Sequence, residues 1–141
     1  MHMSRNLDAA KKYLIDGGFT CVAMKDSQMY TSAERGVKPL LTWLDDSTDL
    51  RGFSVADKVI GNGAAMLYVL LGVKEIYTPV ISCQAKATLD AHGIHNYFDV
   101  CVDKIINRAG TGPCPMENAV AGIDKPQEAL IAIRKKLQEL R

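Results

Sequence analysis

One long apolar stretch, residues 54–71, constrains the fold more than any other part of the chain. It predicts a buried helix that begins after Ser54, because a serine hydroxyl can cap a helix by accepting from a free backbone N–H. Asp57 and Lys58 would then lie in the first turn, where the helix dipole favours a carboxylate. Beyond them almost no polar face remains, and a helix that is apolar all round is buried on most sides. We therefore expect this stretch to be the central helix of the domain.

The size and charge of the chain limit the classes of protein to which it can belong. With 141 residues, 48% of them hydrophobic, residues 1–141 can form a single domain with a real core. The net charge is +1, and the acids and bases are interspersed, so no basic surface for nucleic acid is expected. The uncharged apolar run at 64–73 is too short to span a bilayer, and the first residues show no signal-peptide pattern. We expect a cytoplasmic protein with no nucleic-acid or membrane partner.

Hydrophobic periodicity predicts alternating helices and strands. A hairpin followed by strand–helix–strand units implies a mixed sheet with helices on both faces. Pro79 indicates that its strand bends or lies at an edge. Ser82 and Asp124 are expected to cap the helices that follow them. The predicted helices cover 6–15, 39–45, 83–92, 115–120 and 124–140, and the predicted strands cover 19–25, 28–32, 73–81 and 96–102.

The four cysteines do not form a C-x-x-C pair, and we expect reduced thiols. Cys21 and Cys101 lie in strand-like apolar runs, where a thiol behaves as a small hydrophobe. Cys83 follows the cap Ser82, and a helix N-terminus lowers a thiol pKa, so Cys83 is a candidate nucleophile. The alternative is a half-buried, unreactive thiol. Cys114 also lies at a junction between a loop and a helix.

The segment 105–117 is the richest in residue types that bind ligands. Its two glycines and two prolines favour a fixed irregular path. Cys114 would be the N-cap of a short helix, with Arg108 and Thr111 able to bind an anion beside it. A nucleophilic Cys114 needs a nearby base, and the candidates are His92 and His95, whose positions the sequence does not give. The alternative is a rigid loop with a buried Cys114, capped by Glu117.

Two further patterns are not predicted to hold a metal or cofactor. A zinc site needs three or four convergent ligands, and Gly93 breaks the helical spacing between His92 and His95. The glycines of Gly61-Asn-Gly63 lack the spacing of a dinucleotide or phosphate loop. We interpret them as a place where the helix packs closely against the sheet. The expected cofactor and metal content is none.

Three segments resemble a small family of uncharacterised prokaryotic proteins, the domain of unknown function 1893. They are ADKVIGNGAA (56–65), EIYTPVIS (75–82) and IINRAGTGPCPME (105–117). The resemblance implies a cytidine-deaminase-like fold. In such an α/β fold, a mixed sheet of about five strands is the middle layer of a three-layer α/β/α sandwich.

The chain departs from zinc deaminases at the metal motifs. Those enzymes carry H-x-E at one helix start and P-C-x-x-C at the next. Here the first motif would fall on residues 56–58, where there is no histidine. The second would fall on residues 82–86, where only Cys83 matches and Lys86 replaces the second cysteine. The resemblance therefore implies the fold without deamination.

We predict a metal-free, deaminase-like domain that binds a nucleotide-like or other anionic small molecule at the carboxyl edge of the sheet. Two alternatives stay open. One is a cysteine-dependent enzyme or redox protein that uses Cys114 or Cys83, and the other is a non-catalytic interaction domain that forms a homodimer. The expected ligand-binding residues are Asp57, Lys58, Ser82, Cys83, Asn107, Arg108, Thr111, Cys114 and Glu117.

Overall fold

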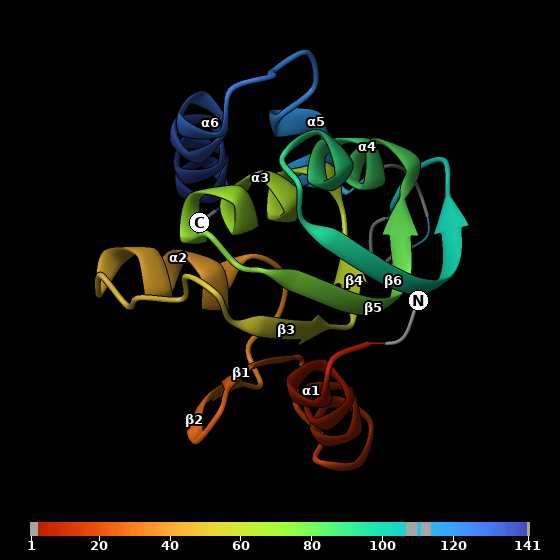
Figure 1. Ribbon diagram of the computed structural model, residues 1–141. Helices are drawn as coiled ribbons and strands as arrows, with labels where there is room; N and C mark the ends of the chain where they lie inside the picture. The colour runs from red at the N-terminus through yellow and green to blue at the C-terminus, as the bar shows by residue number, and fades with distance from the viewer. Residues whose placement is uncertain (1–2, 107–109, 111–113, 141) are drawn as a thin grey trace.

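The computed structural model describes residues 3–106, 110 and 114–140. In this part of the chain, helices surround one mixed sheet (Figure 1). The strands are β1 (Cys21–Lys25), β2 (Gln28–Ser32), β3 (Ser54–Asp57), β4 (Val59–Ile60), β5 (Glu75–Ser82) and β6 (His95–Val102). The helices are α1 (Arg5–Asp16), α2 (Lys38–Asp45), α3 (Asn62–Leu71), α4 (Cys83–Ala91), α5 (Pro115–Ala119) and α6 (Pro126–Glu139).

Most of the predicted elements are confirmed. The β1–β2 hairpin is antiparallel, and Ser82 caps α4 by accepting from the backbone N–H of Ala85 at 3.1 Å. The predicted cap of α6 is wrong, because Lys125 rather than Asp124 occupies the N-cap position, without a side-chain hydrogen bond. None of the helices in the described residues is long and apolar enough to cross a membrane.

The predicted helix at 54–71 is wrong over its first half. Residues 54–57 and 59–60 form β3 and β4, and α3 begins only at Asn62. β-Branched residues such as Val55, Val59 and Ile60 fit a pleated sheet better than a helix. Gly61 then ends the strand and becomes the N-cap of α3. The whole stretch is apolar because a parallel strand buried on both faces has no polar alternation.

β3 and β4 behave as one interrupted strand, so the six strands give a sheet five strands wide. Its order is β2-β1-(β3/β4)-β5-β6, and β3, β4, β5 and β6 are parallel. Ser54 opposes Glu75 and Ile60 opposes Ile81, which is the same offset along β5. At that offset Pro79 stands opposite the interruption, and proline has no N–H for the ladder. The prediction that Pro79 lies at an edge is wrong, since β5 has partners on both sides.

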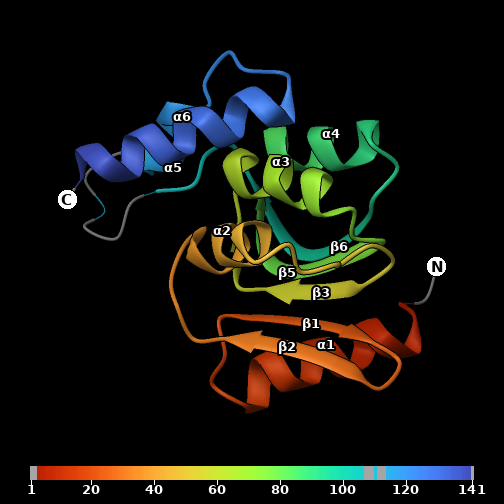
Figure 2. The ribbon, with the colours of Figure 1, turned by 90° about the vertical axis from the view of Figure 1, so that its left-hand side faces the viewer.

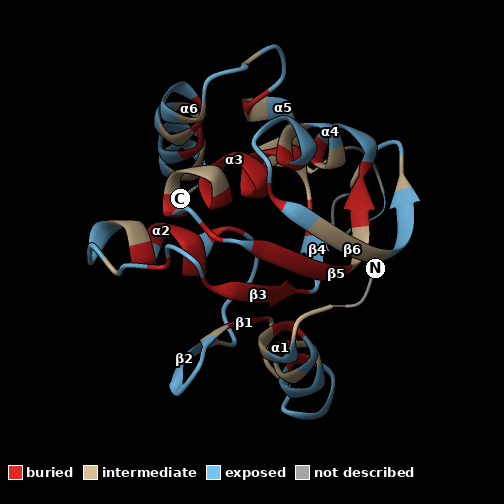
Figure 3. Ribbon diagram, viewed as in Figure 1, coloured by how far each residue is buried: buried red, intermediate tan, exposed pale blue. Residues whose placement is uncertain are grey.

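The two faces of the sheet carry separate apolar clusters (Figures 2 and 3). On one face, α1 is the only helix among the described residues, as Figure 2 shows below β1 and β2. On the other face, α3 lies between the sheet and α6 and contacts α2 and α4. The α1 face buries Leu7, Ala10, Leu14, Val22, Ala56 and Tyr77. The alternate positions Cys21, Ala23, Val55 and Ile76 belong to the larger cluster.

The buried carboxylate of Glu75 links α1 to the amino end of the parallel strands through hydrogen bonds. Glu75 is 5% exposed and accepts from Ser54 Oγ over 2.5 Å. Ser4 Oγ also donates to Glu75, while the same oxygen caps α1 by accepting from the N–H of Leu7. The first turn of α1 is therefore held to the sheet by polar contacts as well as by its apolar face.

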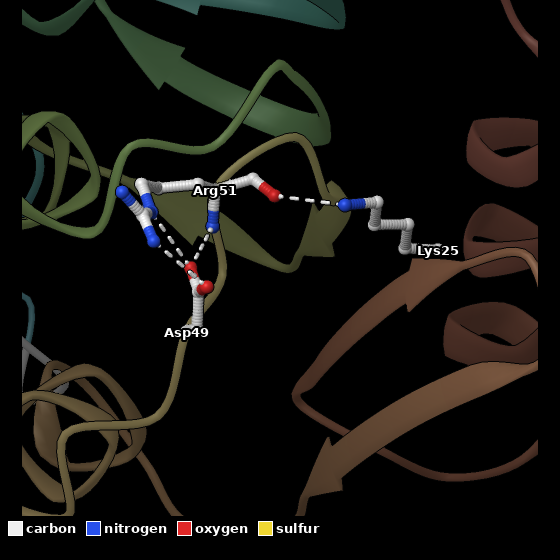
Figure 4. A network of polar contacts seen from close by, with 3 residues as sticks. All are labelled: Lys25, Asp49 and Arg51. Atoms are coloured by element: carbon white, nitrogen blue, oxygen red, sulfur yellow. Dashed lines mark hydrogen bonds and ion pairs between the residues drawn. The ribbon is translucent and has the colours of Figure 1, made fainter.

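An exposed ion pair lies in the turn before β3 (Figure 4). The Arg51 guanidinium donates to both oxygens of Asp49, over 3.0 and 3.1 Å, and Lys25 Nζ donates to the Arg51 carbonyl over 3.5 Å. The hydrogen bond from the Arg51 side chain is the main cause that lowers the pKa of Asp49 to about 2. This network orders the turn at the amino end of β3, at the opposite end from the carboxyl edge considered next.

Candidate functional site

The Glu117 carboxylate lies where the amino ends of α3 and α4 meet, beyond the carboxyl ends of β4 and β5. The backbone N–H of Asn62 donates to Glu117 Oε1 over 3.0 Å. The hydroxyl of Ser82, the N-cap of α4, also hydrogen-bonds to the Glu117 carboxylate. Glu117 therefore caps α3, and not its own helix as the sequence suggested. One carboxylate from α5 joins the first turns of two longer helices.

Burial raises the pKa of Glu117, while the N–H of Asn62 and the hydroxyl of Ser82 act in the opposite direction. The positive end of the α3 dipole also lies beside the carboxylate. Because desolvation is the larger effect, Glu117 can hold a proton at a higher pH than an ordinary glutamate. The chemistry open to such a group is hydrogen bonding to a polar ligand or proton exchange with it.

Gly61 is required by the approach of Glu117 to the helix. A Cβ at Gly61 would overlap Glu117 Oε1 and lie 2.9 Å from its Cδ. The backbone of Gly61 has φ −94, so steric room rather than strain explains the glycine. The predicted close packing against the sheet is therefore wrong for Gly61. A Cβ at Gly63 would lie 3.4 Å from Ile133 Cδ1, which is a packing contact with α6.

The side chain of Asn62 is the second polar component at this position. It is 1% exposed, and its Oδ1 accepts from Thr88 Oγ1 of α4 over 2.5 Å. Its Nδ2 has no hydrogen-bond partner among the described residues. Buried polar atoms are nearly always hydrogen-bonded, so this amide carries an unused donor at the amino end of α3.

Asp57 occupies a different environment from the one predicted. It ends β3, is 7% exposed, and accepts from Tyr68 Oη over 2.6 Å. Tyr68 Oη is in turn 3.2 Å from Cys21 Sγ. Burial raises the pKa of Asp57 to about 7, against the lowering effect of the Tyr68 hydroxyl. Asp57 thus belongs to a buried polar row, not to the first turn of a helix.

Apart from Ser82, none of the predicted polar site residues has a side-chain hydrogen bond or ion pair with Glu117 in the part of the chain that the structure describes. Lys58 is exposed in the interruption between β3 and β4. Asn107, Arg108 and Thr111 lie outside the described residues. The ends of their segment are near the cluster, since Ile105 Cγ1 would be 3.4 Å from a Cβ at Gly61. The N–H of Cys114 donates to the carbonyl of Ile105 over 2.9 Å.

Cys83 is exposed, but its neighbours do not activate it. Its Sγ lies 3.4 Å from Cys101 Sγ and 3.8 Å from Asp103 Oδ1. The hydrogen bond with Cys101 is the largest cause that raises the pKa of Cys83, and burial and the charge of Asp103 act in the same direction. The predicted lowering by the helix N-terminus is therefore wrong. Cys101 lies in a strand as predicted, but it is exposed and contacts Cys83, so it does not pack as a small hydrophobe in the core.

Cys114 is the N-cap of α5, as predicted, but its side chain makes no capping hydrogen bond. The histidines considered as bases lie elsewhere. His92 is the C-cap of α4 and His95 opens β6. α4 has 9 residues, so its two ends are about 13 Å apart. Neither histidine is therefore next to Cys83 at the amino end of α4.

A metal centre does not emerge from the described geometry. Across residues 3–106, 110 and 114–140, no three His, Cys, Asp or Glu side chains converge where they could hold an ion. The carboxyl-edge cluster consists of one carboxylate, one hydroxyl, one amide and helix N–H groups, all of which can hydrogen-bond to a ligand.

The sequence predicted some of the residues of this cluster and missed others. Glu117 and Ser82 were predicted ligand-binding residues, and they are in contact. Asn62 was missed because a polar residue within an apolar run was assigned to the helix interior. The role of Gly61 was missed because a glycine can be required by any close neighbour, and the neighbour here is 56 positions further on in the sequence. Cys101 was missed as a partner of Cys83 because it depends on the β5–β6 pairing.

These features define a small mixed α/β domain with a polar cluster at the carboxyl edge of its parallel strands. Residues 9–137 match the family described as TM1506, domain of unknown function (DUF1893), and the chain belongs to that family. A crystal structure of a DUF1893 family protein, TM1506 from Thermotoga maritima, is similar with a TM-score of 0.87 and 25% identity, over 96% of this chain and 92% of that one. No curated protein matches.

Proposed function

We propose that this domain binds a small polar ligand of the nucleobase or nucleoside type at the cluster of Glu117, Asn62 and Ser82. Helices on both faces of a mixed, largely parallel sheet support a three-layer, cytidine-deaminase-like architecture as part of this proposal. In open α/β sheets, ligands bind beyond the carboxyl ends of the strands. The cluster lies at that edge.

The observation that carries the proposal is the buried amide nitrogen of Asn62, which has no hydrogen-bond partner within the part of the chain that the structure describes. A buried amide nitrogen without a partner is destabilising by about 1–3 kcal/mol, and a ligand acceptor would relieve that penalty. Glu117 offers the complementary acceptor, since its carboxylate reaches the backbone N–H of the same residue. A donor and an acceptor this close in space suit a ligand edge that carries both groups.

This arrangement narrows the ligand class. A phosphate at the amino end of α3 would have to displace the Glu117 carboxylate, which already satisfies the Asn62 N–H. A neutral amide or amidine edge, as in a nucleobase, would instead donate to Glu117 and accept from Asn62. We therefore favour the uncharged base of a nucleotide-like ligand, and not its phosphate, as the part bound at this position.

Titration with cytidine, adenosine and inorganic phosphate tests the proposal. Binding is followed by the melting temperature and by backbone amide chemical shifts. We expect a nucleoside to raise the melting temperature and to shift the amides of residues 61–63 and 82–85, whereas phosphate leaves them in place. If neither nucleoside moves these amides at millimolar concentration, the proposal is refuted.

Two charge-matched variants make the test specific. Glu117→Gln keeps the shape of the side chain but removes the charged acceptor, and we expect affinity to fall by roughly 10–100-fold. Glu128→Gln changes an exposed residue in the first turn of α6 and should bind as the wild type does. Equal affinity in wild type and Glu117→Gln would show that the nucleoside binds elsewhere.

A further inference from the structure

We propose that Cys83 and Cys101 form a dithiol site that closes reversibly to an intramolecular disulfide by exchange with a small disulfide such as oxidised glutathione. The site is adjacent to Ser82 of the proposed ligand cluster, but the proposal does not depend on ligand binding there. It arises from the pairing of β5 with β6, which places the first residue of α4 beside a strand residue 18 positions away.

The geometry favours this pair over any other. The two sulfurs are 3.4 Å apart, and a disulfide bond of about 2 Å requires them to approach by only about 1.4 Å. Cys101 is aligned with Ile81, two residues before Cys83, so the two backbones are already neighbours. Both thiols are exposed, so a dissolved disulfide can reach them.

The other two cysteines are placed differently. Cys21 is 1% exposed and its Sγ contacts the hydroxyl of Tyr68. Cys114 is the N-cap of α5 and is half-buried. A selective reagent should therefore distinguish the exposed pair from these two thiols.

The reaction is balanced by glutathione disulfide as the oxidant. One protein thiolate attacks glutathione disulfide, forming a mixed disulfide and releasing one glutathione thiolate. The second protein thiolate then attacks the protein sulfur of the mixed disulfide and releases the second glutathione. The two thiol protons pass to the two glutathione thiolates, so the protein loses two hydrogen atoms. Excess reduced glutathione reverses both steps.

The disulfide would link the first residue of α4 to the next-to-last residue of β6 and enclose residues 84–100. Closing this loop restricts the unfolded chain, so the oxidised protein should melt at a higher temperature than the reduced one. Oxidation would replace the hydrogen bonds that the Cys83 thiol makes with Cys101 and with Asp103 by one covalent bond. The bond would form next to Ser82, which bonds to Glu117.

The test incubates the reduced protein with oxidised glutathione over a series of ratios to reduced glutathione. Unreacted thiols are then blocked, and peptides are mapped by mass spectrometry. We expect one internal disulfide, 83–101, to form first and to disappear when reduced glutathione is in excess. A first-formed bond that contains Cys114, or two separate mixed disulfides at Cys83 and Cys101, would overturn the proposal.

Serine variants provide the controls. Cys83→Ser and Cys101→Ser should each abolish the internal disulfide and the associated rise in melting temperature, leaving a mixed disulfide on the remaining thiol. Cys114→Ser should retain both effects. Circular dichroism establishes that the variants are folded, which is expected at exposed positions. If Cys83→Ser still forms an internal disulfide at the wild-type rate, the assignment is wrong.

Discussion

The buried carboxyl of Asp57 should make the stability of the protein depend on pH between about 4 and 7. Its pKa is about 7 in the folded protein, compared with 3.8 for an ordinary aspartate. Between these values the unfolded chain releases a proton that the folded chain retains. The contribution of Asp57 to stability is thus fully present below pH ~4, falls as the pH rises, and is lost above pH ~7. The total change is about 4 kcal/mol, because one pKa unit corresponds to about 1.4 kcal/mol.

The substitution Asp57→Asn removes this ionisation. An amide oxygen can still accept from Tyr68 Oη, and the amide never becomes charged. Integrated from about pH 5 to about pH 8, the wild type should lose roughly 3 kcal/mol more unfolding free energy than the variant. Urea unfolding at the two pH values, followed by the fluorescence of the buried Trp43, measures this difference.

Comparing the wild type with Asp57→Asn separates the titration of Asp57 from that of the other ionisable groups. Burial also raises the pKa of Glu117, so it contributes to the pH dependence with the same sign. Since both proteins retain Glu117, its contribution cancels in the difference. Asp16→Asn, at the exposed end of α1, makes the same charge change and should follow the wild-type curve. If wild type and Asp57→Asn show equal slopes from pH 5 to 8, Asp57 does not hold its proton in the fold and the reasoning fails.

Three further predictions concern polar contacts at the ends of the sheet. Gly61→Ala should displace the Glu117 carboxylate from α3 and destabilise the fold by about 1–3 kcal/mol. The same substitution should destabilise a Glu117→Ala variant much less, and a double-mutant cycle measured by urea unfolding would report the difference. Ser54→Ala should destabilise by about 1–3 kcal/mol because it removes a donor from buried Glu75, and an unchanged urea midpoint would contradict that. Ser82→Ala should lower stability by about 1 kcal/mol through loss of the α4 cap, with the thermal midpoint as readout.

Local signals predicted the elements that depend on their own residues. The Ser82 cap, the hairpin and α2 after Pro39 follow from turn chemistry and periodicity within a few positions. The start of α3 could not be obtained in this way. A parallel strand buried on both faces and a buried helix are equally apolar, so residues 54–60 carried no periodicity that would separate them.

Prediction of the candidate site from local sequence signals is limited in the same way. Glu117 and Ser82 were predicted from their positions near helix starts, but their contact depends on how α5 docks against α3 and α4. The pKa of Cys83 was predicted in the wrong direction because the sequence showed the helix N-terminus but not Cys101 on the adjacent strand. Contacts between distant segments, and the desolvation that accompanies them, follow from the tertiary fold.

The capping of α3 by Glu117 couples the exchange of one backbone hydrogen to the attachment of α5. The N–H of Asn62 is protected by a carboxylate that arrives from α5, 55 residues later in the sequence. This hydrogen can be replaced by deuterium only when Glu117 withdraws, whereas hydrogens further along α3 depend on the opening of the helix itself. In native-state hydrogen exchange, the protection of Asn62 would therefore report how often α5 detaches while the sheet and α3 remain folded.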